Sequence, residues 1–304
     1  MNKSIRIIGM AALVLLLVVS CKKENQDGSR KVTLKAGVES PSGKTYVDAS
    51  WRVHWNQGDK IRVNNNLMDL EEMEVGDIWA TFVCNDWVGP LPGETPSLYA
   101  IAPAAEQKSW TNTEGKTCWK SRVTIPANQT LTYCQSNLPQ GILVEAGSTV
   151  LNFQNLVNIY RLPVYTEGDV TITKVTMEKI PAIGDNYPLV ADIWFPHFGV
   201  DWSNVERIGG ESFIITLDCG DGVKISNSST QLGATYFNFV AFPVPWNDVE
   251  FKLYNGENLV ATITKHIDDV WDEETQTLKN PIEHNRVYSI FAKPEADPLE
   301  AYKI

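Results

Sequence analysis

The chain has 304 residues, 43% of them apolar, and a formal net charge of −11 at neutral pH. This acidic balance argues against a nucleic-acid partner and against electrostatic attraction to an anionic membrane surface. The length is enough for two domains, each with a core of its own.

The first twenty residues have the pattern of a signal peptide. Lys3 and Arg6 give a basic start, and residues 7–19 (IIGMAALVLLLVV) form an uninterrupted apolar run. A run of 13 residues is too short to cross a bilayer comfortably but matches the core of a signal peptide. We therefore assign residues 1–20 to a signal peptide.

The residue after this segment, Cys21, carries the main localisation signal. Residues 18–21 (VVSC) resemble a bacterial lipobox, in which a signal peptidase cuts before the cysteine and the thiol receives a lipid. A plain secretory cut is the alternative. We expect Cys21 to be acylated, and two or more acyl chains anchor durably because each buried CH2 contributes about 0.8 kcal/mol. Residues 21–30 then form a polar, lipidated tether.

Residues 31–165 have the pattern of strands separated by turns, with little helical periodicity. Residues 32–38 (VTLKAGV) alternate apolar and polar side chains, as a half-buried strand does. Residues 56–59 (NQGD) predict a turn. A short helix is indicated around 152–158. The other strands expected in this half are 51–55, 60–63, 78–83, 97–102, 121–125, 149–153 and 157–165.

A polar break containing glycine, 166–170 (TEGDV), divides the chain. Strand patterns resume after it, and we place a domain boundary near residue 166. The sequence thus predicts an all-β protein with two tandem β-sandwich domains, 31–165 and 166–293, and a short polar tail, 294–304. The strands expected in the second half are 171–177, 189–195, 212–217, 235–242, 249–254, 259–264 and 286–292.

Four cysteines remain once Cys21 is lipidated. None lies in a zinc-binding spacing, so we interpret them as small buried residues, with a disulfide as the alternative in an oxidising envelope. Four thiols allow three pairings, and the sequence does not choose among them. These residues are Cys84, Cys118, Cys134 and Cys219.

Seven phrases, in order behind the lipobox, resemble the fimbrillin family of pilin-like lipoproteins of Bacteroidetes. The second resembles the family's W-x-x-G-D-x-I-x-V stretch, and the others match its shorter elements. They are 43–46 (GKTY), 53–63 (VHWNQGDKIRV), 99–104 (YAIAPA), 125–129 (IPANQ), 151–164 (LNFQNLVNIYRLPV), 238–243 (NFVAFP) and 285–290 (NRVYSI).

The resemblance implies transthyretin-like sandwich domains, a lipid-anchored outer-membrane location facing the cell surface or a fimbrium, and assembly by strand exchange. In the family, a protease removes the first strand together with the lipid, and a strand of a neighbouring subunit fills the vacated groove. The residue that matches the cleavage position is Lys44, where polymerising members usually carry arginine. Expected partners are therefore other fimbrial subunits or a second copy, the outer membrane through Cys21, and a host or bacterial surface ligand.

Two departures from the pattern of the fimbrillin family favour an accessory, anchor or tip role over that of a main shaft subunit. Arg30 precedes the first strand, so a cut there would free the lipid and leave the groove filled. Residues 294–304 (PEADPLEAYKI) are acidic and contain two prolines, which makes a poor donor strand.

Catalytic signatures are absent from the sequence, and we expect no enzyme activity, cofactor or metal. The four histidines, His54, His197, His266 and His284, are far apart. Residues 268–274 (DDVWDEE) predict a solvated loop, with weak Ca2+ binding as the alternative, although the glycine of an EF-hand loop is missing.

Ten tryptophans support an alternative function, a glycan-binding surface lipoprotein. Four lie in strand patterns and are expected in the core: Trp51, Trp55, Trp79 and Trp194. Six neighbour turns and could be exposed: Trp87, Trp110, Trp119, Trp202, Trp246 and Trp271. A contiguous row of exposed indoles would favour the glycan-binding hypothesis.

Overall fold

The computed structural model describes residues 30–38, 55–74, 79–94, 97–111, 115, 117–136, 138–145, 147–180, 186–196, 205–244, 248–266, 271–272, 277–278, 286–292 and 299–304. Within these ranges the protein is almost entirely β-structure, so the predicted all-β class is confirmed. No helix in the described part is long and apolar enough to span a bilayer.

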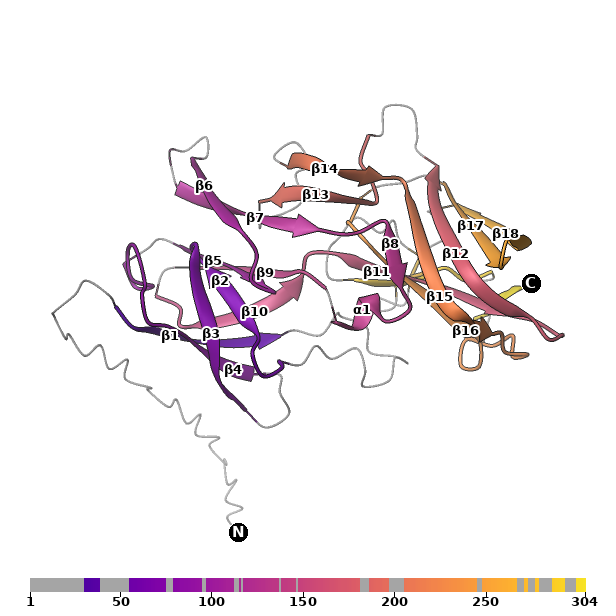
Figure 1. Ribbon diagram of the computed structural model, residues 1–304, viewed down its shortest axis with the longest axis horizontal. Helices are drawn as coiled ribbons and strands as arrows, with labels where there is room; N and C mark the ends of the chain where they lie inside the picture. Colours follow the sequence, from indigo (N-terminus) through magenta and orange to yellow (C-terminus); the bar gives the residue numbers. More distant parts are fainter. Residues whose placement is uncertain are drawn as a thin grey trace, which may run out of the picture.

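The first body is a closed barrel with the strand order β1-β10-β9-β5-β2-β3-β4, drawn at the left of Figure 1. The predicted amino-terminal sandwich is therefore corrected to a barrel, because β1 pairs with both β4 and β10 and so joins the two ends of the sheet. Its strands are β1 (Val32–Val38), β2 (Lys60–Val63), β3 (Asn66–Met73), β4 (Trp79–Cys84), β5 (Ser97–Ala102), β9 (Gln140–Glu145) and β10 (Val150–Asn155).

The second body packs two sheets face to face, at the right of Figure 1. Their inner faces meet through contacts such as Phe239 with Phe251, whose ring centroids are 5.7 Å apart. One sheet has β11 (Asn158–Tyr165), β16 (Thr235–Ala241), β19 (Trp271–Asp272), β20 (Thr277–Leu278), β21 (Val287–Ser289) and β22 (Tyr302–Lys303). The other has β8 (Asn128–Thr130), β12 (Thr171–Ile180), β15 (Ile214–Lys224), β17 (Asp248–Asn255) and β18 (Asn258–His266).

A third, four-stranded sheet runs along the upper edge of the molecule in Figure 1. Val123 and Ile193 of this sheet belong to the apolar core of the second body. Its strands, in the order β14-β13-β7-β6, are β14 (Glu206–Ser212), β13 (Val190–Phe195), β7 (Thr117–Thr124) and β6 (Gln107–Thr111).

Strand pairing crosses the boundary predicted near residue 166. β7 pairs with β13, β8 pairs with β15, and β11 pairs with β16. The polar break at 166–170 is the connection from β11 to β12, which lie in the two facing sheets of one body. Two apolar cores do exist, but the first is built from strands within 32–102 and 140–155, and the division at 166 does not separate the sheets.

Several local predictions can be compared directly with the structure. The turn at 56–59 is present, since the Asn56 N–H donates to Asp59 Oδ2 at 2.7 Å and Gly58 has a φ of 91°. The helix expected around 152–158 is wrong, because β10 and β11 occupy that segment. The helix found is α1 (Tyr133–Ser136). Of the predicted strand 51–55, only Trp55 lies within the described residues.

Candidate functional site

The first strand is the element on which the predicted assembly mechanism depends, and the structure places it in the barrel wall. β1 runs antiparallel to β4, with Leu34 opposite Phe82, and parallel to β10, with Ala36 opposite Leu151. Removing β1 would therefore open the barrel and leave backbone donors and acceptors unpaired along both neighbours. The expectation that residues 31–38 form an intrinsic pairing element is confirmed.

The inward face of β1 is apolar and fully covered. Leu34 and Ala36 have relative exposures of 1% and 0% and join a core that contains Trp55, Phe82 and Phe153. The ring of Trp55 meets those of the two phenylalanines edge-on, at centroid distances of 4.8 and 5.8 Å. The side chains of β1 thus fill a pocket whose far wall is aromatic.

A tryptophan ties the middle of β1 to the barrel from inside. The Trp55 indole N–H donates to the Ala36 carbonyl at 3.2 Å. Trp55 belongs to the W-x-x-G-D phrase of the sequence, so this motif holds the first strand as well as filling the core. The expectation that Trp55 is buried is confirmed, at 5% exposure.

The outward face of β1 contains a close contact that the sequence analysis missed. Gly37 pairs with Trp79, whose ring lies against the glycine so closely that a Cβ there would come within 2.6 Å of it. Lys35 covers the same ring, with its Nζ 5.1 Å from the centroid, and bonds Glu74 at 2.5 Å. A glycine inside a strand often marks such a close approach, and Gly37 in residues 32–38 was that signal.

Ion pairs add little to the hold on β1. Lys31 pairs with Glu71 at 3.3 Å and Arg30 with Glu94 at 3.9 Å, and all four side chains are about half exposed or more. Exposed pairs of this kind contribute about 0–1 kcal/mol. Backbone pairing and apolar packing therefore retain the strand.

The two residues predicted to be processed, Cys21 and Lys44, lie outside the described residues. Arg30, the other basic residue considered as a cleavage point, is described. Its carbonyl accepts a hydrogen bond from the Trp87 N–H at 3.1 Å. The chain is thus held to the barrel from the residue before β1 begins.

The last residues of the segment predicted as a short polar tail, 299–304, are also paired with the body. β22 runs parallel to β11, with Tyr302 opposite Val164, and Ala301 is buried. The Tyr302 hydroxyl donates to the Phe291 carbonyl at 3.2 Å, and the Ile304 N–H donates to the Tyr165 carbonyl at 2.9 Å. Ala301 is buried, and Tyr302 and Ile304 pack against the apolar core, contacts that the acidic composition of the tail obscured.

All four cysteines of the body are free thiols in the structure. Burial raises the pKa of Cys134 to about 11 and that of Cys219 to about 12, and it also raises the pKa of Cys84. A thiol with a raised pKa is a poor nucleophile. The interpretation of these three as small buried residues is confirmed, whereas Cys118 is partly exposed.

The tryptophans divide differently from the prediction. Trp87 is 2% exposed, because it packs into the barrel core and its indole N–H donates to the Pro90 carbonyl at 2.9 Å. Trp79 and Trp194, expected in the core, are partly exposed, as are Trp110 and Trp119. The alternation that suggested burial is real, but in both strands the tryptophan lies on the outward face. Trp51, Trp202 and Trp246, and the side chain of Trp271, lie outside the described part.

Only some residues of the remaining predicted sites lie within the described ranges. His54, His197 and His284 lie outside the described residues, as does most of 268–274, so the Ca2+ alternative stays a prediction. His266 contacts Asp248 on the neighbouring strand, with Nδ1 and Oδ1 2.5 Å apart. No group of three or more metal-ligating side chains occurs within the described ranges.

Solved structures similar to this chain include candidate cell adhesion proteins from Bacteroides. One from Bacteroides uniformis is 14% identical, with a TM-score of 0.42, over 80% of this chain and 86% of its own. One from Bacteroides ovatus is 14% identical, with a TM-score of 0.44, over 79% and 87%. One from Bacteroides fragilis is 12% identical, with a TM-score of 0.33, over 84% and 91%.

Each of these neighbours is described as a cell adhesion protein. No protein-family model and no curated protein matches the sequence.

Proposed function

We propose that this protein is a fimbrillin-like, lipid-anchored adhesion protein of the outer membrane that joins other subunits by contacts of the strand-exchange type. The observation that supports strand exchange is the position of β1, which lies between β4 and β10 and closes the barrel. An unoccupied place there would present two strand edges and an apolar pocket, which β-augmentation by another chain satisfies.

The proposed role is that of an anchor, tip or other accessory subunit. The residues that could serve as a carboxyl-terminal donor strand are engaged in the protein's own sheet through β22 and β11. The amino-terminal strand is engaged as well, and Arg30 lies ahead of it. A subunit with both ends paired internally does not extend a filament until one of them is released.

Strand exchange can be tested by replacing part of 39–50 with a site for a specific protease. We expect that the cut protein, after its first strand is washed out in mild denaturant, binds a labelled peptide of residues 30–40. It should also form oligomers, seen by light scattering, when no peptide is added. The matched control is the same peptide with Gly37→Val, which should not bind because its side chain meets Trp79.

Failure of the wild-type peptide to bind a barrel that remains folded by circular dichroism would contradict strand exchange.

The lipid anchor at Cys21 has a separate test. Cys21→Ala should abolish labelling by a radioactive fatty acid and release the protein from the membrane fraction. A variant that stays membrane-bound and normally processed would overturn the lipid anchor and leave the strand-exchange proposal standing.

A further inference from the structure

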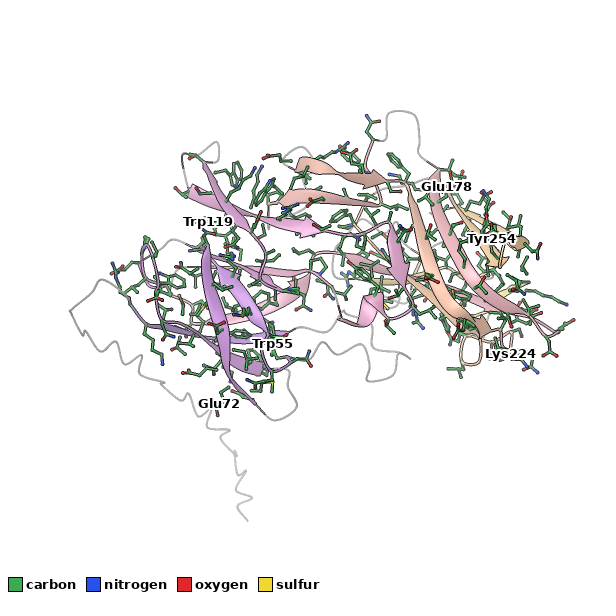
Figure 2. The ribbon with its side chains drawn as sticks, viewed as in Figure 1. Trp55, Glu72, Trp119, Glu178, Lys224 and Tyr254 are labelled. Carbon is green, nitrogen blue, oxygen red and sulfur yellow. The ribbon has the colours of Figure 1, made fainter. Side chains whose placement is uncertain are left out.

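The outward face of the four-stranded sheet carries two partly exposed tryptophans among charged side chains. We call this surface the indole face and define it by Trp110, Trp194, Lys108, Lys120, Arg122, Asp192, Glu106 and Glu206. These residues come from β6, β7, β13 and β14 and from the residue just before β6. The side chains around this sheet can be followed in Figure 2.

Strand register places these side chains together. Lys108 lies opposite Lys120, Trp194 lies opposite Arg122, and Glu206 lies opposite Trp194. The residues that alternate with them, such as Val123 and Ile193, are buried in the core on the other side of the sheet. Around Arg122 and Trp194 the indole face is therefore the outer surface of the sheet, whereas Trp110 is partly exposed with its indole nitrogen buried.

Each tryptophan ring is covered by a lysine head group. Lys108 Nζ lies 4.5 Å from the centroid of Trp194 and 2.6 Å from Glu206 Oε2, and Lys120 Nζ lies 5.0 Å from the centroid of Trp110. Lysine is flexible and strongly hydrated, and cation–π contacts at exposed sites are weak. A ligand that packs on the ring can displace such a cover and still receive hydrogen bonds from the ammonium group.

A firmer ion pair lies beside Trp194, on the side away from Trp110. Arg122 donates to both carboxylate oxygens of Asp192, at 2.6 Å from Nη2 and 3.1 Å from Nε, and Thr124 donates to the same carboxylate at 2.9 Å. This planar, bidentate arrangement holds its geometry better than a single exposed contact does. The indole face thus has a fixed ion pair at one end and movable lysine covers over its two rings.

The charge of the indole face is balanced. Three cations, Lys108, Lys120 and Arg122, lie with three anions, Glu106, Asp192 and Glu206. Nucleic acid and other polyanions bind surfaces with a clear excess of positive charge, which this face lacks. A neutral ligand with many hydroxyl groups suits the mixture of donors and acceptors.

The same composition argues against a protein partner. Lysine, glutamate and aspartate are depleted in the centre of protein interfaces, and here they surround both indoles. Indole rings separated by charged hydrogen-bonding groups instead match the two sides of a sugar ring, its apolar C–H face and its hydroxyl edge. We propose that the indole face binds a neutral glycan, with sugar rings on Trp110 and Trp194 and hydroxyls bonded by Lys108, Lys120 and Glu206.

This inference rests on the proposed adhesive function and specifies the ligand class. It is tested by affinity gel electrophoresis of the mature chain, without its lipid, in gels that contain mannan, dextran, xylan or galactan, with heparin as the charged comparison. We expect at least one neutral polysaccharide, and not heparin, to retard the protein. Trp110→Ala and Trp194→Ala should each weaken that retardation about tenfold, and the double variant should abolish it.

The matched control is Trp119→Ala. Trp119 lies on β7 beside these residues and is partly exposed, but it pairs with Ser109 and so lies on the opposite face of the sheet (Figure 2). The Trp119→Ala variant should be retarded as strongly as the wild type, and circular dichroism should show that all variants are folded. Retardation by no neutral polysaccharide, by heparin alone, or equally in the double variant would overturn the proposal. These outcomes are independent of the peptide-exchange and lipid-labelling results, because the indole face includes neither β1 nor Cys21.

Discussion

Both ends of the described chain pair with one continuous segment, and the two ends differ in how firmly they are held. β1 runs parallel to β10, and β22 runs parallel to β11, the strand that follows β10 directly. β1 has a neighbour on each side and an inward apolar face, whereas β22 comprises two residues against one neighbour. Backbone pairing alone therefore does not determine how firmly a terminal strand is held. The number of neighbouring strands and the side chains that the strand buries decide its stability.

The largest expected effect is in the pocket beneath β1. Leu34→Ala should lower the free energy of unfolding by about 2–5 kcal/mol, since it leaves a cavity against the aromatic wall. Urea denaturation measures the loss. Thr33→Ala, on the exposed side of the same strand, should change stability by less than about 0.5 kcal/mol. Equal effects would mean that β1 is not packed as described.

The contact between Gly37 and Trp79 comes next. Gly37→Val should destabilise the barrel by about 1–3 kcal/mol, because the new side chain overlaps the indole ring. Combining it with Trp79→Ala should recover part of the loss, and thermal unfolding of the single and double variants measures the coupling. If the stability losses of the two single variants simply add in the double variant, the backbone preference at residue 37, and not the Trp79 ring, makes the glycine necessary.

Removal of the carboxyl-terminal strand should cost less. A chain ending at residue 298 loses buried Ala301 and the hydrogen bonds of β22, and we expect about 1–2 kcal/mol. Hydrogen exchange should show faster exchange at Ile304 than at the paired amides of β1 in the intact protein. Slower exchange at the carboxyl terminus would reverse the proposed difference between the two ends.

The smallest expected effect is a pH dependence of stability from the Arg122–Asp192 ion pair of the indole face. The hydrogen bond from Arg122 holds the pKa of Asp192 below its usual range. The stabilisation is therefore present above the unfolded pKa of about 3.9 and is lost as the pH falls through the lower, folded value. Thermal unfolding should show Asp192→Asn less stable than the wild type at pH 7, with the difference shrinking below about pH 4. If the stability difference between the wild type and Asp192→Asn did not change with pH, ionisation of the Asp192 carboxylate would be excluded as its source.

The local elements were largely predictable, whereas their partners were not. Alternation identified 60–63, 97–102 and 189–195 as strands, and the structure contains them with small shifts at the ends. Alternation contains no information on which distant strand pairs with which, and the parallel pairing of β1 with β10 joins residues more than 100 positions apart. A glycine-containing turn also looks the same whether it joins two domains or two sheets of one body, so the sequence did not reveal that strand pairing crosses residue 166.

The candidate sites show the same limit. Trp55 was correctly placed in the core, and Gly37 was visible as an anomaly in its strand. Trp87 was misjudged because a neighbouring turn suggests exposure, whereas its ring is buried in the barrel core. The indole face required the register of four strands, since Trp110 and Trp194 are 84 residues apart in the sequence and lie on the two strands that flank β7.

The placement of β1 also has a mechanical consequence. If the protein is tethered to the membrane through its amino terminus, a pull on a bound ligand reaches the fold at β1. The component of that pull along the strand loads the hydrogen bonds to β4 and β10 in shear, so that they must break together and not one after another as in peeling. The tether would thus pull on one of the elements best able to resist extraction, which suits a molecule that must hold its grip in flowing liquid.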